Sequence, residues 1–229
     1  MEKISSRKLA EIVESVSLPE ETEISGVSTN SREINPGDAF LALKGEKFDG
    51  HDFAFDAYQN GAALLIVSRK IENVPEDRQV LVADTGRAYG LLGRHNRRQF
   101  KGQVIALTGS AGKTTTKEEL KFVLSQFGRV YATLGNYNNY SGVPRTLLDL
   151  DMNADFAVIE MGMSAKGEIA DLVSYTEPDM AIVTNVYPMH IEFFPDFEAI
   201  AEAKAEIFRG LKKGGTAVIN ADANFADLL

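Results

Sequence analysis

The feature that most constrains this chain is a glycine-rich segment between an apolar stretch and an amphipathic one. A strand is expected before it, over residues 104–107, and a helix after it, over residues 114–127. The segment itself reads Thr108, Gly109, Ser110, Ala111, Gly112, Lys113, Thr114, Thr115, Thr116. A strand, a glycine-rich loop and a helix in this order are typical of a P-loop domain built on a parallel sheet.

The chemistry of such a loop follows from its residue types. Backbone N–H groups and the helix N-terminus bind phosphate oxygens, and Gly109 and Gly112 let the backbone approach them. Lys113 supplies a cation for the terminal phosphates, and Thr114 offers a hydroxyl to Mg²⁺. Residues 108–115 are therefore the predicted ATP-binding residues. Leu107 stands where the longer form of this motif has glycine, which leaves a turn that holds no ligand as the alternative.

Strands and helices alternate along the whole chain. After the loop, strands are expected over residues 156–160, 180–185 and 216–220, and helices over residues 168–175 and 197–211. The first hundred residues give shorter segments, with strands expected over 39–43, 62–67 and 80–82 and helices over 4–16, 51–60 and 84–101. We predict an α/β protein in which a small α/β N-terminal domain, residues 1–100, precedes a P-loop parallel-sheet domain, residues 101–229.

Composition excludes several classes of function. The 24 basic and 33 acidic residues give a formal net charge of −9, whereas a generic nucleic-acid binder needs a surplus of cations. The absence of cysteine excludes disulfides, thiolate metal sites and cysteine nucleophiles. The longest apolar run, residues 62–67, is too short to span a membrane, and the N-terminus does not resemble a signal peptide. A cytoplasmic protein is expected.

Polar residues follow the later strands, where ligands collect at the carboxyl edge of a parallel sheet. Glu160 ends one expected strand, His190 follows another, and Asn138 with Asn139 lies in a polar loop. Together with the P-loop they predict a site for Mg-ATP. A lone histidine is more often structural than a ligand, and Lys204, inside an expected helix, is interpreted from sequence alone as a surface lysine.

Basic residues gather at the end of the helix expected over 84–101. Two readings stay open for this group, a solvated helix face or a rim facing a phosphate-bearing ligand. Its members are Arg94, His95, Arg97, Arg98 and Lys101.

Taken together, these motifs resemble those of the Mur ligases, the ATP-dependent amide-forming ligases of peptidoglycan precursor synthesis. The resemblance runs from about residue 24 to residue 222. It rests on the P-loop and on the following segments: Asn30-Ser31-Arg32, Pro36-Gly37-Asp38, Asp49-Gly50-His51, Gly135-Asn136-Tyr137-Asn138-Asn139, Glu160-Met161-Gly162, Gly167-Glu168-Ile169, Pro188-Met189-His190 and Ala203-Lys204-Ala205-Glu206. The Gly-Asn-x-Asn-Asn and Gly-Glu-Ile segments indicate the member that uses D-alanyl-D-alanine.

The resemblance implies a mechanism and its substrates. ATP would phosphorylate the terminal carboxylate of a UDP-N-acetylmuramoyl-tripeptide, and the amine of D-alanyl-D-alanine would attack the acyl phosphate. Lys113, Glu160, His190 and Lys204 would be the catalytic residues, with Thr114, Glu160, His190 and Lys204 serving Mg²⁺. Lys204 matches the lysine that many members carry as a carbamate, against its reading from sequence alone. Ser31 and Arg32 match the region that binds UDP, and Asn138 and Asn139 match the loop beside the muramoyl substrate.

The resemblance also bears on what the chain lacks. It implies that the central domain is truncated at Leu229 and that a third domain is missing, so that the 229 residues are a fragment, inactive alone, of a ligase that is a monomer in full-length form. Two alternatives stay open. One is another Mur-type ligase that adds an earlier peptide residue, and the other is a non-catalytic module that binds a UDP-substrate or nucleotide.

Overall fold

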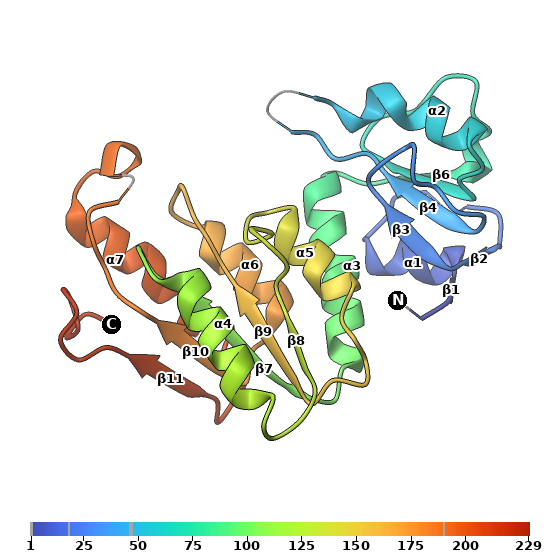
Figure 1. Cartoon of the computed structure of the whole chain (residues 1–229). Helices are drawn as coiled ribbons and strands as arrows, with labels where there is room; N and C mark the ends of the chain where they lie inside the picture. The colour runs from blue at the N-terminus through green and yellow to red at the C-terminus, as the bar shows by residue number, and fades with distance from the viewer. Residues whose placement is uncertain (1, 18, 46–47, 190) are drawn as a thin grey trace. The chain divides into compact units, whose positions relative to one another are not determined.

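The structure is a computed structural model that describes residues 2–17, 19–45, 48–189 and 191–229. The chain divides into two compact units, Met1–Leu92 and Gly93–Leu229, and each unit has a parallel sheet of its own (Figure 1). This boundary falls inside a helix, eight residues before the end of the domain expected over residues 1–100. The predicted α/β class is confirmed.

Four short parallel strands form the sheet of the first unit. Their order is β3 (Gly26–Ser28), β4 (Asp38–Leu41), β5 (Leu64–Val67), β6 (Gln79–Leu81). All residues of β4 and β5 are buried, as expected for parallel strands with both faces covered. The remaining elements are β1 (Ile4–Ser5) paired with β2 (Glu23–Ile24), the helices α1 (Ser6–Ile12) and α2 (Ala54–Gln59), and the 3₁₀ turns η1 (Gly50–Phe53) and η2 (Glu76–Arg78).

Five parallel strands form the sheet of the second unit. Across the sheet their order is β11 (Thr216–Ile219), β10 (Met180–Val183), β7 (Gln103–Thr108), β9 (Phe156–Glu160), β8 (Val130–Ala132). The central strand β7 has β9 on one side and β10 on the other, with Leu107 opposite Glu160 and Thr108 opposite Val183. This register brings the ends of three strands, and the loops that follow them, to one edge of the sheet.

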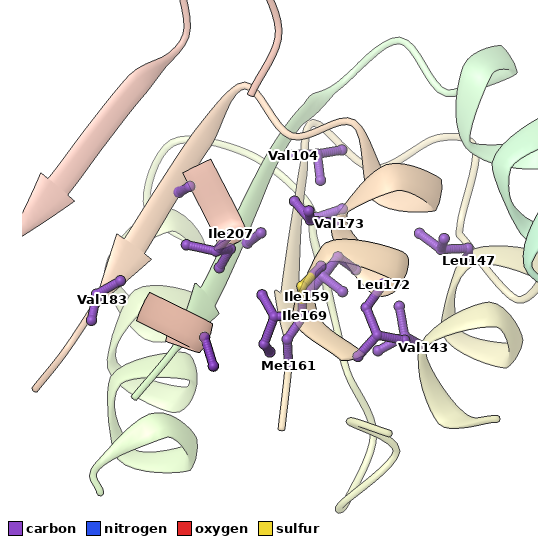
Figure 2. Packing of buried hydrophobic residues seen from close by; sticks show 14 of the residues in the cluster. Val104, Val143, Leu147, Ile159, Met161, Ile169, Leu172, Val173, Val183 and Ile207 are labelled. Atoms are coloured by element: carbon purple, nitrogen blue, oxygen red, sulfur yellow. The ribbon is translucent and has the colours of Figure 1, made fainter. Parts of the chain in front are cut away.

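Helices cover both faces of this sheet (Figure 1). Leu120 and Leu124 of α4 (Lys113–Leu124) pack against Leu107 and Val158 on one face. The larger core, on the other face, joins alternate strand residues such as Val104, Ile159 and Val183 to the helices (Figure 2). Those helices are α5 (Gly142–Leu148), α6 (Glu168–Thr176) and α7 (Phe197–Ala205), followed by the 3₁₀ segment η4 (Glu206–Gly210). Both faces of the sheet below the loops at its edge are therefore covered by packed side chains.

The basic residues at the end of the helix expected over 84–101, with a solvated face as one of their two readings, do not share one environment. Arg94, His95, Arg97 and Arg98 lie in α3 (Thr85–Gln99), and Lys101 follows it. The Arg97 side chain is 2% exposed; its Nε donates to the Thr176 carbonyl at 2.8 Å and its guanidinium to the Glu177 carbonyl at 2.9 Å. Arg98 is largely exposed and pairs with Glu177. The solvated-face interpretation is thus wrong for Arg97, which satisfies the last carbonyls of α6.

Several elements differ from those expected. The sequence reading did not include α5 or β8, and the helix expected over residues 197–211 ends at Ala205 and continues as η4. A further 3₁₀ turn, η3 (Ile191–Phe193), precedes α7. Among the described residues, no helix is both long and apolar enough to cross a membrane.

Candidate functional site

The glycine-rich loop joins the end of β7 to the start of α4, as the sequence predicts. Gly112 has φ +75°, a left-handed conformation that glycine adopts without strain, and α4 begins at the next residue. At position 109 glycine is required for a different reason, the lack of space for a side chain. A Cβ at position 109 would collide with the Thr184 hydroxyl and lie 3.2 Å from the Thr184 Cβ. The two glycines thus allow the turn and its close contact with the end of β10.

Residues after β10 hold the loop in place. The N–H of Ser110 donates to the Asn185 carbonyl at 3.2 Å, and that of Ala111 to Asn185 Oδ1 at 2.9 Å. The Thr184 hydroxyl and Asn185 Nδ2 both donate to the Ala111 carbonyl, each at 2.9 Å. Sequence reasoning did not single out Thr184 or Asn185, although two polar residues directly after a buried strand were a usable signal. With these amides occupied, the loop offers an anion chiefly the free N–H groups of the first turn of α4.

Lys113, Thr114 and Glu160 meet beside that first turn. Lys113 Nζ donates to the Gly109 carbonyl at 2.9 Å. The Thr114 hydroxyl donates to Glu160 Oε2 at 3.1 Å, and Asn138 Nδ2 donates to Glu160 Oε1 at 2.8 Å. Glu160 is 1% exposed, so its carboxylate is held by neutral donors in a place that water scarcely reaches. This hydroxyl–carboxylate pair connects the phosphate loop to the neighbouring strand.

The two predicted loop asparagines have different roles in the structure. The Asn138 carbonyl accepts from the Gly162 N–H at 2.7 Å, so the side chain and the backbone of this residue bind its loop to the end of β9 and to the segment that follows it. Asn139 Oδ1 accepts from the N–H groups of Ser141, at 3.3 Å, and Gly142, at 2.9 Å. The Asn139 side chain therefore supports the turn into α5.

A cleft of about 250 Å³ opens beside the loop. Six of the predicted site residues line it: Gly109, Ser110, Lys113, Asn138, Asn139 and Lys204. Sequence reasoning assigned no role to the five further lining residues: Gly162, Met163, Ser164, Glu168 and Met189. Glu168 opens α6, and its Oε2 accepts from the Ser164 N–H at 2.6 Å. The cleft is thus lined both by lysine side chains, Lys113 and Lys204, and by the carboxylate of Glu168.

Lys204 lies on α7 and is 4% exposed, so its interpretation as a surface lysine is wrong. Burial, together with the positive charge of Lys113, lowers the pKa of Lys204 to about 8. In a substantial fraction of the molecules, the Lys204 side chain is then a neutral amine at mildly alkaline pH.

Glu206, two residues after Lys204, is also buried. Its carboxylate accepts from the N–H groups of Gly167, at 3.0 Å, and Ala170, at 3.2 Å, and so holds the start of α6.

The donor set fits Mg²⁺. A threonine hydroxyl and one carboxylate, next to a phosphate loop, are the hard oxygen ligands that this ion takes together with substrate phosphates. The part of the chain that the structure describes holds no cluster of three or more histidine, cysteine, aspartate and glutamate side chains suited to a metal. Mg²⁺ bound through one or two carboxylates needs no such cluster. The predicted ligand His190 lies outside the described residues.

Ser31 and Arg32 lie in the first unit, around a cavity of about 330 Å³. The cavity has an aromatic rim, since Phe48 and Phe53 are 72% and 40% exposed. Ser31 is nearly buried, whereas Arg32 is exposed and its N–H donates to Asn30 Oδ1 at 3.1 Å. An exposed guanidinium beside aromatic rings suits a ligand that carries both a phosphate and a flat ring.

His51, in the Asp-Gly-His segment, connects two segments of the first unit by hydrogen bonds. Its Nε2 accepts from the Ser68 N–H at 2.8 Å, so the ring proton lies on Nδ1, which donates to Asp49 Oδ1 at 2.6 Å. The His51 N–H also donates to Asp49, and these contacts, with Arg69, lower the pKa of the Asp49 carboxyl although burial opposes them. His51 is 5% exposed, which indicates a structural role.

Two family models match the chain. The model of the Mur ligase middle domain matches residues 107–229, and that of the Mur ligase family catalytic domain matches residues 23–95. Together they include both the cavity with Ser31 and Arg32 and the cleft beside the phosphate loop.

Individual relatives agree with these matches. The UDP-N-acetylmuramoyl-tripeptide–D-alanyl-D-alanine ligase of Escherichia coli is 47% identical over 88% of this chain and 44% of its own length, and that of Bacillus subtilis is 43% identical over 89% and 45%. The crystal structure of MurF from Acinetobacter baumannii superposes with a TM-score of 0.90 at 39% identity, covering 99% of this chain and 50% of that one. MurF from Thermotoga maritima, solved in complex with ADP, gives 0.80 at 41%, covering 86% and 45%. The chain spans about half the length of the curated relatives it matches.

Proposed function

The chain belongs to the Mur ligase family, and from this premise we propose that it supplies the UDP-substrate and ATP-binding parts of a ligase that joins D-alanyl-D-alanine to a UDP-N-acetylmuramoyl-tripeptide. The observation that carries the proposal is the junction of Thr114 with Glu160 beside the loop that holds Lys113. Relatives that are 37–47% identical over most of this chain carry this activity in their names.

The proposed reaction has two steps, a phosphoryl transfer and an acyl transfer. The tripeptide carboxylate attacks the γ-phosphorus of ATP, and ADP leaves with the bridging oxygen, which gives an acyl phosphate. The amine of D-alanyl-D-alanine then attacks the acyl carbon, loses a proton, and phosphate leaves. Both steps depend on positioning and on neutralising charge around the phosphoryl group.

Within this scheme the residues of the second unit bind and orient the nucleotide. Residues 108–115 would form the phosphate site, with the N–H groups at the start of α4 as its main free donors, and Lys113 would exchange its bond to the Gly109 carbonyl for one to a terminal phosphate oxygen. Thr114 and Glu160 would hold Mg²⁺, and by the family resemblance His190 and a carbamylated Lys204 would complete its ligands. Bound Mg²⁺ neutralises the charge that develops on the phosphate oxygens. Asn138 orients Glu160, and Asn139 shapes the loop beside the muramoyl substrate.

In the first unit, Ser31 and Arg32 would bind the UDP part of the substrate at the cavity with the aromatic rim. Because ATP and UDP-linked precursors are cytoplasmic metabolites, we place the protein in the cytoplasm. There it would act as a monomer in full-length form, and its product would serve cell-wall synthesis, cell shape and division.

Titration calorimetry tests the proposal on the 229-residue chain. UDP-N-acetylmuramoyl-tripeptide should bind, and Arg32→Ala should weaken this binding at least about tenfold, the usual result of losing a charged contact to phosphate. Arg7→Ala is the matched control, since Arg7 is an exposed arginine on α1 that pairs with Glu21. Mg-ADP should bind separately, with Lys113→Ala weakening it and Lys121→Ala, on the exposed side of the same helix, leaving it unchanged.

The outcomes separate the candidate functions. A folded chain that binds neither ligand contradicts the proposal. Binding of both ligands by the 229 residues, with no phosphate released by a longer chain that spans the length of the relatives, would favour a non-catalytic binding module. Transfer of an amino acid other than D-alanyl-D-alanine by that longer chain would identify another Mur-type ligase.

A further inference from the structure

Lys117 is a fully buried cation to which the proposed function assigns no role. It lies on α4, one helical turn after Lys113, and its side chain is 2% exposed. A lysine is almost never buried to this extent unless its ammonium group is paired and hydrogen-bonded. The partners of Lys117 therefore show what the charge is used for.

Those partners belong to the elements that build the Mg-ATP site. Lys117 Nζ donates to the Thr133 carbonyl at 2.9 Å and to the Gly135 carbonyl at 3.4 Å, both just after β8. It lies 4.0 Å from Glu160 Oε2 and 3.2 Å from Glu118 Oε1, the latter on an exposed side chain. One ammonium group thus joins α4, the segment that leads to Asn138, and the buried carboxylate of β9.

A second set of bonds makes the arrangement rigid. Thr133 Oγ1 accepts from the Glu160 N–H at 3.0 Å, so residue 133 contacts Lys117 with its carbonyl and Glu160 with its hydroxyl. Asn138, five residues on, donates to Glu160 at 2.8 Å. If the ammonium were removed, the Thr133 and Gly135 carbonyls would lose their donor and Glu160 would lose its nearest cation.

We propose that Lys117 is a positioning residue, which holds the Glu160 carboxylate and the 133–138 segment in the arrangement that receives Mg²⁺ with the nucleotide. The inference rests on the proposed function, because it assumes that Glu160 is a magnesium ligand. If Lys117 only fastened α4 to the segment after β8, no charge would be needed at this position. Its substitution would then change the nucleotide affinity equally with Mg²⁺ and without it.

The test is the ADP affinity of the 229-residue chain in MgCl₂ and in EDTA, measured by calorimetry. In Lys117→Met the gain in affinity from Mg²⁺ should fall about tenfold or more, the usual result of losing a group that orients a metal ligand. Its affinity in EDTA should stay within about twofold of the unsubstituted chain. Lys121→Met, which removes an exposed lysine one turn later on the same helix, should change neither value.

An equal loss of affinity in both conditions, or a full Mg²⁺ gain in folded Lys117→Met, overturns the inference. If methionine prevents folding, Lys117→Gln replaces it, since an amide can still donate to the Thr133 carbonyl but carries no charge, and the same two results decide. If instead the unsubstituted chain binds ADP with no gain from Mg²⁺, the magnesium site of the proposed function fails, and the inference fails with it.

Discussion

Three lysines of the second unit show how the surroundings of a side chain decide its chemistry. Lys121 is exposed, Lys117 is buried among acceptors, and Lys204 is buried with another cation, Lys113, near it. Burial with acceptors stabilises an ammonium group, whereas burial beside a like charge favours the neutral amine. The same residue type is therefore a solvated charge at position 121, a buried hydrogen-bond donor at 117 and an amine of lowered pKa at 204.

The pKa of Lys204, about 8, can be measured directly. In protein labelled with ¹³C at the lysine ε carbon, one resonance should titrate near pH 8 and should be missing from Lys204→Met. The unfolded chain keeps the ordinary value of 10.5 and so binds more protons between pH 8 and 10.5. Wild-type stability should therefore rise over that range. Absence of any lysine resonance titrating below pH 9 would contradict this assignment.

The same shift predicts the effect of removing the charge. Well below pH 8 the folded state carries the full cost of a buried ammonium, so Lys204→Met should raise the free energy of unfolding at pH 7, by about 3 kcal/mol. At pH 10.5 the gain should largely vanish. Urea unfolding at the two pH values measures this, and an equal change at both would show that packing, not charge, dominates at this position.

Gly109 sets the path of the phosphate loop through the absence of one atom. Gly109→Ala should weaken ADP binding about a hundredfold, because the new methyl group would displace the loop from the Thr184 hydroxyl. Adding Thr184→Ala should recover part of this loss, although it also removes the bond to the Ala111 carbonyl. Calorimetric titration of the two variants measures the effect, and wild-type affinity in Gly109→Ala would refute the steric reason.

Among the helices, α6 shows how ends are stabilised by residues distant in sequence. The Glu206 carboxylate accepts from two N–H groups at its start, and Arg97 donates to carbonyls at its end. Each charge has the sign that the helix dipole favours. The helix that begins with the cleft residue Glu168 is therefore held at both ends by side chains from other elements.

Arg97 and Arg98 form a matched pair for testing this arrangement. Arg97→Met should lower the free energy of unfolding by about 3 kcal/mol, since it leaves the Thr176 and Glu177 carbonyls without a donor. Arg98→Met removes a largely exposed ion pair and should cost less than about 1 kcal/mol. Denaturant unfolding of both variants measures the difference. Equal losses of unfolding free energy in the two variants would mean that the buried Arg97 guanidinium stabilises the fold no more than the exposed Arg98 does.

For the molecule as a whole, the two compact units should respond to different ligands. Mg-ADP should raise the melting temperature of the Gly93–Leu229 unit only, and UDP that of the Met1–Leu92 unit only, because each ligand stabilises the unit that binds it. Differential scanning calorimetry with each ligand separately measures this. A single transition that both ligands raise equally would show that the units unfold together.

Much of the fold was predictable because its signals are local. The alternation of apolar strands with amphipathic helices predicted the α/β class, and the loop was placed between β7 and α4. Local patterns missed α5 and β8, for two different reasons. The Gly-Val-Pro start of α5 resembles a turn in sequence, yet six of its seven residues are buried, so tertiary packing outweighed local preference. The short edge strand β8 gave too few residues for a periodic signal.

The site divides in the same way. The sequence by itself determined that a glycine-rich loop between a strand and a helix, a carboxylate at the end of a strand and a polar asparagine loop occur in one α/β unit. Only the tertiary structure decided that Lys204 and Arg97 are buried, that Asn138 contacts Glu160 whereas Asn139 supports a turn, and that Asn185 occupies two amides of the loop. The physical reason is that periodicity depends on neighbouring residues, whereas burial and hydrogen-bond partners depend on segments that meet only when the sheet is assembled.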